Sequence, residues 1–244
     1  MTGASSPSST SGAVVAAVRA ALRAAADPEV APGQQAYMKS AMPYYGVTAP
    51  RLKQVLRPIL AAYRPADREE WQAEVRVLWD EATHREERYA ATALARHRAA
   101  RPWQDPAALD LYRHLVVTGA WWDHVDEVAH RIGDLCATHP AEMDPVLRTW
   151  SRDRSMWLRR LAILGQLRRR DQVDLALLAD VIEANLDDPE FFVRKAIGWA
   201  LRDVARHHPA WVRSFVETHR LSALSRREAL KHLDSTWGVE RPHD

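Results

Sequence analysis

Apolar residues along the chain recur at spacings of three and four positions and rarely alternate. Two clear examples are DQVDLALLADVI, which begins at Asp171, and WVRSFVETH, which begins at Trp211. Such spacing is typical of amphipathic helices. Polar segments with proline separate the periodic stretches and offer Asp or Thr as helix caps; they are DPEVAPGQ, PYYGVTAP, RPADREE, RPWQDP, THPAEMDP, DDPE and HHP. The pattern predicts an all-α protein of about twelve to fourteen helices.

Similar segments recur along the chain at steps of 35 residues. They begin at Glu87, Trp122, Trp157, Phe192 and Arg227. Each is expected to begin a helix, and four of the five are followed by a loop and a second helix. Helix pairs repeated at a fixed period stack so that equivalent helices line one face. We therefore expect a superhelical solenoid of helical hairpins with a concave surface.

Polar residues at repeat positions that are mostly apolar in the other units mark candidate sites. Asp126, Arg160 and Lys195 are such exceptions, because their equivalents are mainly Ala, Val or Leu. The spacing predicts that these side chains are neighbours in space. It leaves two interpretations open, a ladder of salt bridges between repeats and a functional site.

The overall composition is that of a soluble globular protein, with 244 residues, 47% hydrophobic, 27% charged and a formal net charge of +2. No apolar run approaches the roughly 20 residues that span a bilayer, so no membrane association is expected. Residues 1–12 lack the features of a secretory signal and are expected to form a disordered tail before a single domain, 13–244. The single cysteine, Cys136, fits a reduced, buried residue in a cytoplasmic protein.

Arginine dominates the basic residues, with 30 Arg against 4 Lys. Genome base composition can explain the total, but the local clustering is more informative. Between Ser151 and Arg170, seven arginines accompany one acid, a local charge of +6. Such a strip suits phosphate or another polyanion, although a solvated helix face would look similar.

The sequence lacks a Gly-rich phosphate loop, a His-Glu-x-x-His pair, a Cys-x-x-Cys pair and a nucleophile elbow, which argues against most familiar enzyme classes. The most distinctive local feature is WWDHVD at 121–126. One helical turn places Trp122 and Asp126 on the same face, and Trp157 and Trp199 come from the next two repeats. The other tryptophans are expected to pack the core, namely Trp71, Trp79, Trp103, Trp150, Trp211 and Trp237.

Longer stretches carry a family resemblance. They are YMK from Tyr37, GVTAP from Gly46, TGAWWDHVD from Thr118, MWLRRLAIL from Met156, EFFVRKAIGWALRD from Glu190 and LSRREALKH from Leu224. Through them the chain resembles the HEAT-like-repeat DNA glycosylases of the AlkD type, which act in DNA alkylation repair. The resemblance covers nearly all of the chain beyond the N-terminal tail. It implies that the predicted hairpins are HEAT-like.

The resemblance also implies roles for individual residues. Asp126 falls at the position of the catalytic carboxylate, and Trp122 and Trp199 are the aromatic residues expected to act with it. The residues expected to bind substrate DNA are Tyr37, Thr48, Arg160, Arg194 and Lys195. Of these, Arg160 would grip a phosphate with two hydrogen bonds. Neither a cofactor nor a metal is expected.

Together these expectations describe a monomeric, monofunctional DNA N-glycosylase of the 3-methyladenine/7-methylguanine type, which would act on double-stranded DNA in base excision repair. Its substrates would be cationic N3- or N7-alkylated purines, whose leaving group needs no protonation, so one carboxylate could stabilise the oxocarbenium-like sugar and position water. Two alternatives remain. A non-catalytic helical-repeat scaffold would bind nucleic acid or an acidic protein through the same surface. A protein–protein adaptor would leave the arginines of 151–170 unexplained.

Overall fold

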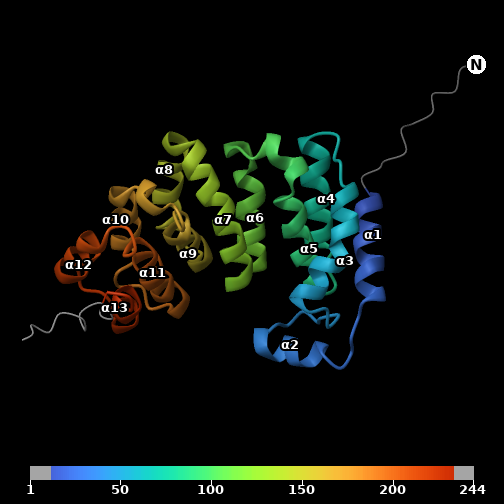
Figure 1. Ribbon diagram of the computed structural model, residues 1–244, viewed down its shortest axis with the longest axis horizontal. Helices are drawn as coiled ribbons and strands as arrows, with labels where there is room; N and C mark the ends of the chain where they lie inside the picture. The colour runs from blue at the N-terminus through green and yellow to red at the C-terminus, as the bar shows by residue number, and fades with distance from the viewer. Residues whose placement is uncertain (1–11, 234–244) are drawn as a thin grey trace, which may run out of the picture. The chain divides into compact units, whose positions relative to one another are not determined.

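The computed structural model describes residues 12–233, and every regular element in that range is a helix (Figure 1). The predicted all-α fold is therefore confirmed. The chain divides into two compact units, Met1–Trp103 and Gln104–Asp244. None of the helices between residues 12 and 233 is long and apolar enough to cross a membrane. The tail expected at 1–12, except Gly12, and the core position expected for Trp237 lie outside the described residues.

The first unit contains five α-helices and one 3-10 helix among its described residues: α1 (Ala13–Ala24), α2 (Ala31–Met38), α3 (Ala49–Ala62), α4 (Arg68–Asp80), α5 (Arg85–Ala95) and η2 (Arg98–Trp103). Helices α4 and α5 pack side by side, and α1 packs against α3, α4 and α5. Val18, Leu22, Trp71 and Trp79 are fully buried between these helices, which confirms the core role of both tryptophans. Trp103 is half-buried and stacks on Trp71 with ring centroids 6.0 Å apart.

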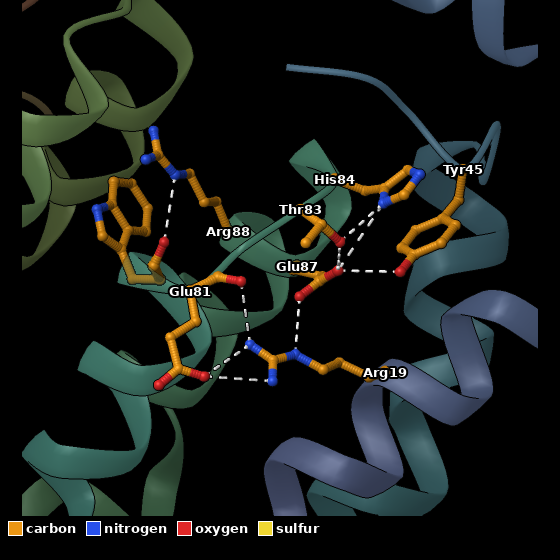
Figure 2. A network of polar contacts seen from close by, with 8 residues as sticks. Arg19, Tyr45, Glu81, Thr83, His84, Glu87 and Arg88 are labelled. Carbon is orange, nitrogen blue, oxygen red and sulfur yellow. Dashed lines mark hydrogen bonds and ion pairs between the residues drawn. The ribbon is translucent and has the colours of Figure 1, made fainter.

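Two consecutive acids at the start of α5 hold the loop that leads into α3. The fully buried Glu86 carboxylate accepts the backbone N–H groups of Tyr45, Gly46 and Val47, each at 3.0 Å. Glu87 accepts hydrogen bonds from the hydroxyl of Tyr45 at 2.9 Å and from Nε of Arg19 at 2.9 Å (Figure 2). The loop backbone is therefore fixed by side chains of α5, because buried N–H groups need partners.

Glycine is required inside this loop. Gly46 has φ of 87°, a region that other residues rarely adopt. A Cβ atom at this position would lie 1.9 Å from the backbone oxygen of Asp27. The GVTAP segment singled out in the sequence is therefore a tight turn packed against the loop between α1 and α2.

Glu74 is a buried acid in the core of the first unit and makes the stability of the protein depend on pH. It is 3% exposed and accepts a hydrogen bond from the Tyr63 hydroxyl at 2.7 Å. Burial raises the pKa of Glu74 to about 7. Because the folded state binds this proton more tightly than the unfolded state does, the stabilising effect of the neutral carboxyl is full below pH 4.5 and is lost as the pH rises to about 7.

We therefore expect Glu74→Gln to be more stable than the wild type at pH 8, by about 3 kcal/mol, and nearly equal to it at pH 4. The amide can still accept the Tyr63 hydrogen bond but cannot ionise. Urea unfolding at the two pH values measures the difference. The matched control is Glu69→Gln on the exposed side of α4, which should change stability little at either pH. A pH-independent effect of Glu74→Gln would contradict the assignment.

The described part of the second unit repeats helical hairpins. Its elements are η3 (Pro106–Ala108), α6 (Leu109–Gly119), α7 (Trp122–Thr138), α8 (Pro140–Trp150), α9 (Met156–Leu164), η4 (Arg170–Gln172), α10 (Leu175–Glu183), α11 (Phe191–Val204), α12 (Pro209–Thr218) and α13 (Ala223–Leu230). Helix α7 packs against α9, α9 against α11, and α11 against α13. Helices α6, α8 and α12 pack against α7, α9 and α13, respectively, while α10 packs against both α8 and α9. The predicted stacking of equivalent helices is thus present within this unit.

The 35-residue step matches the helix starts closely. Trp122 is the first residue of α7, and Trp157 and Phe192 are the second residues of α9 and α11. Arg227 lies further along its helix, as the fifth residue of α13. Helices α11 and α13 approach closely at Gly198, where a Cβ atom would lie 2.5 Å from Cβ of Glu228. A side chain at this position would therefore push α13 away from α11.

The remaining core expectations for this unit are mostly met. Cys136 is buried, and burial raises the pKa of its thiol to about 11. Trp150 is also buried. Trp211, expected in the core, is only half-buried on α12, where it stacks on Phe215 with ring centroids 5.1 Å apart. Its indole therefore covers the edge of the unit.

Candidate functional site

The centre of the candidate site is an ion pair between Asp126 of α7 and Arg160 of α9. Nε of Arg160 donates to Oδ1 of Asp126 at 2.9 Å, and Nη2 donates to Oδ1 at 2.7 Å and to Oδ2 at 2.9 Å. Nη1 donates to the backbone oxygen of Phe192 at 2.7 Å. One guanidinium therefore holds both oxygens of the carboxylate and links α7 and the middle of α9 to the beginning of α11.

This pairing confirms the prediction that Asp126 and Arg160, at adjacent positions of consecutive repeats, are neighbours in space. It also bears on the role of Arg160, whose side chain is only 4% exposed. The bidentate geometry expected toward a phosphate is directed instead at Asp126. The phosphate contact stays a prediction, and the guanidinium would have to leave the carboxylate to make it. The observed hydrogen bonds support a role in orienting Asp126.

The Asp126 carboxylate is largely withdrawn from water, with 19% of its side-chain surface exposed. Burial raises the pKa of Asp126 above its ordinary value, because the charged form loses hydration. The adjacent Arg160 guanidinium lowers the pKa and partly offsets this effect, while the nearby Asp123 raises it further. The ionised form of Asp126 therefore depends on Arg160.

An aromatic cluster contacts this ion pair through Phe192. Trp121, Trp157 and Phe192 are in mutual contact, with ring centroids 5.2 to 6.0 Å apart. Cζ of Arg160 lies 6.0 Å from the centroid of the Phe192 ring. Edge and tilted contacts of this kind add about 0.5–1.5 kcal/mol each beyond the burial of area. The cluster therefore fixes the ion pair against the start of α11.

Trp122 and Trp199 lie on helices that form the site. Trp122 is the half-buried first residue of α7, four positions before Asp126, so the predicted helical spacing of these two residues is observed. Trp199 is half-buried on α11, four positions after Lys195. Their contacts with substrate remain predictions.

Lys195 and Arg194 occupy the first half of α11. Nζ of Lys195 lies 2.8 Å from Oε1 of Glu228 on α13, and the other oxygen of Glu228 accepts a hydrogen bond from Arg202. The two cations lower the pKa of Glu228, with the hydrogen bond from Lys195 as the main cause. Nε of Arg194 is buried and makes no hydrogen bond. Lys195 is thus partly neutralised by α13.

The other two residues expected to bind DNA belong to the first unit. Tyr37, in the last turn of α2, is 79% exposed, and Thr48 is the exposed residue that precedes α3. Thr48 and Arg51 line an open hollow of about 430 Å³ beside the turn at Gly46. The side chains of Tyr37 and Thr48 are therefore accessible to a ligand that binds the first unit.

The seven arginines between 151 and 170 lie on α9 and on the segments that flank it. Arg152 and Arg154 precede α9, and Arg168, Arg169 and Arg170 follow it. The helix between the two groups is about 13 Å long. Arg160 pairs with Asp126, and Nε of Arg159 donates to Asp188 at 2.8 Å. The basic strip is therefore partly neutralised by carboxylates of the same unit, and its binding of a polyanion stays a prediction.

Sequence reasoning missed two contributors to the site. The backbone oxygen of Phe192 receives Arg160, and no side-chain pattern reports on a carbonyl group. Glu228 lies at the second position of the repeat unit that begins at Arg227, where the sequence pattern does not distinguish it from other helical carboxylates. It lies 33 positions after Lys195, close to one repeat period, so the period brings the two residues near each other without specifying that they pair.

Among residues 12–233, no group of three or more His, Cys, Asp or Glu side chains is placed to bind a metal ion. The site is built instead from one carboxylate, one guanidinium and aromatic rings. The fold and this site define a helical-repeat protein whose catalytic candidate is Asp126, a carboxylate largely withdrawn from water.

Comparison with known proteins then identifies the family. The family model described as DNA alkylation repair enzyme matches residues 18–233, so the chain belongs to this family. Among solved structures, the chain is similar to a predicted DNA alkylation repair enzyme from Enterococcus faecalis. The two share 29% sequence identity and a TM-score of 0.78 over 85% of this chain and 96% of that one. No curated protein matches the chain.

Proposed function

We propose that the protein is a monofunctional DNA N-glycosylase that removes cationic N3- or N7-alkylated purines from duplex DNA. The observation that carries this proposal is the single carboxylate of Asp126, held through both oxygens by Arg160 beside aromatic rings. Membership of the DNA alkylation repair enzyme family makes damaged DNA the natural substrate. The type of lesion and the reaction are inferred from the chemistry of the site.

Hydrolysis of an alkylated purine makes modest demands on a protein. The C1′–N bond breaks and its electron pair leaves with the base, which neutralises the positive charge introduced by alkylation. The deoxyribose becomes oxocarbenium-like, and an anion beside C1′ stabilises that charge. Water then bonds to C1′ through oxygen and releases a proton to Asp126 or to solvent. Asp126 would stabilise the sugar and orient the water.

Other residues would hold the damaged nucleotide against this carboxylate. Indole faces of Trp122 and Trp199 can attract a cationic sugar, each by about 0.5–2 kcal/mol. The exposed phenol of Tyr37, in the first unit, would contact the DNA. Thr48, Arg194 and Lys195 would contact the DNA backbone, and Lys195 would exchange Glu228 for a phosphate to do so. Recognition would then depend on the charge of the lesion and on the backbone path.

The product would be an abasic site with an intact strand. A lyase reaction needs a neutral amine that attacks C1′. Among the lysines within residues 12–233, Lys195 is the one placed at the site, and its Nζ is already engaged by Glu228 at 2.8 Å. The protein would therefore leave strand cleavage to another enzyme.

The proposed reaction predicts release of 7-methylguanine and 3-methyladenine from duplex DNA treated with a methylating agent. The released bases can be separated by chromatography, and the rate should be unchanged in EDTA because the leaving group is already activated. Uncharged hypoxanthine should be released far more slowly. If hypoxanthine leaves at an equal rate, or if EDTA abolishes activity, the proposed mechanism is wrong. Duplex binding without any release would favour the non-catalytic scaffold.

A further inference from the structure

Phe191, the first residue of α11, is a prominent exposed apolar side chain beside the candidate site. Its ring is 53% exposed, whereas the neighbouring Phe192 is half-buried. A single exposed apolar residue is common on protein surfaces. Phe191 is different because its ring is held in place by the same residue that anchors the ion pair.

The Phe191 ring packs edge-on against Phe192, with centroids 5.3 Å apart and planes 79° from parallel. Two further contacts hold Phe192 in place. Its ring packs on that of Trp157, with centroids 5.2 Å apart, and its backbone oxygen accepts a hydrogen bond from Arg160. Arg160 in turn holds Asp126. The position of the exposed ring is therefore tied to the position of the carboxylate through two intervening residues.

The charges next to the ring indicate what it can contact. Glu190 and Asp187, immediately before α11, are exposed carboxylates, and carboxylates repel phosphate groups. A duplex that approaches this point is therefore expected to meet the ring with a base or sugar and to keep its phosphates away. Apolar side chains contact DNA in this way, by packing on sugars or entering the base stack.

We propose that Phe191 is a substrate-binding residue that packs against the nucleotide next to the alkylated one. This contact would position the duplex so that the alkylated nucleotide lies at Asp126. The proposal rests on the proposed function, since it takes Asp126 as the reacting group. Phe191 is separated from Asp126 by Phe192 and Arg160, so its ring reaches the neighbouring nucleotide and does not touch the reacting one.

A binding experiment tests this contact without requiring base excision. The probe is a duplex that contains a tetrahydrofuran abasic analogue with 2-aminopurine as the adjacent base. We expect the wild type to bind and to change the 2-aminopurine fluorescence. Phe191→Ala should bind about tenfold more weakly and lose the fluorescence change, since one base–aromatic contact has an effect of this size. Phe191→Trp should restore both.

Two controls separate this contact from a general effect on folding or charge. Val77→Ala shortens another exposed apolar side chain, which lies on α4 of the first unit, and should leave binding unchanged. Asp126→Asn should retain the fluorescence change. In single-turnover excision, Phe191→Ala should raise the half-saturating protein concentration and leave the maximal rate near that of the wild type.

The outcomes distinguish this proposal from the proposed function. If the wild type excises bases and Phe191→Ala binds the probe with unchanged affinity and fluorescence, the contact is refuted and the glycosylase assignment stands. If Phe191→Ala weakens binding while the wild type excises nothing, the contact stands and the glycosylase assignment fails. A wild-type protein that does not bind the duplex would refute both.

Discussion

Replacing Asp126 with Asn is expected to lower the rate of base excision by about 100-fold or more while duplex binding changes little. The variant keeps the shape of the side chain but removes the negative charge that would face C1′, and one well-placed electrostatic group is typically worth that much in the transition state. Single-turnover excision of 7-methylguanine measures the loss. Binding of an abasic-analogue duplex measures whether the surface is intact.

The control for this variant lies one turn earlier on the same helix. Asp123→Asn makes the same chemical change on α7, at a residue that accepts the backbone N–H of His124 at 2.9 Å. It should leave excision near the wild-type rate. Because Asp126→Asn leaves the Arg160 guanidinium without its carboxylate, thermal unfolding must be followed in parallel. A folded Asp126→Asn protein that excises at the wild-type rate would show that another group performs the chemistry.

Removing the partner of Asp126 is expected to change the pH dependence of excision. Arg160 favours the ionised carboxylate, so Arg160→Gln should raise the pKa of Asp126 beyond the increase caused by burial. Activity requires the ionised form, which is lost as the pH falls through that pKa. The acid limb of the rate profile should therefore move to higher pH. Loss of orientation should also lower the plateau rate, by about 10- to 100-fold.

The salt dependence of duplex binding separates this role from a phosphate contact. If Arg160 orients Asp126, the slope of log K against log salt should be the same in Arg160→Gln as in the wild type. Loss of one phosphate contact would reduce the slope by about one unit, and that result would restore the role expected from the resemblance. Arg159→Gln is the matched control, because Arg159 lies on the same helix but pairs with Asp188. It should not shift the acid limb.

Much of the fold could be predicted because its determinants are local and repeated. Apolar spacing identifies the helices, and prolines with polar caps locate their ends, as at Asp67, whose carboxylate accepts the N–H of Glu70. The 35-residue period identifies equivalent helices, and therefore predicts that Asp126 and Arg160 are neighbours. Similarly, the four-residue spacing of Trp122 and Asp126 is enough to place both side chains on one face of α7.

The tertiary structure alone decided how these neighbours interact. A repeat period brings Arg160 close to Asp126, but the direction of the guanidinium depends on the Phe192 carbonyl and the aromatic rings around it. The ion pair of Lys195 with Glu228 and the protonation of Glu74 likewise depend on burial by helices distant in the sequence. Hydrophobic periodicity records which face of a helix is buried, whereas hydrogen-bond partners and desolvation are set by the packing of several helices at once.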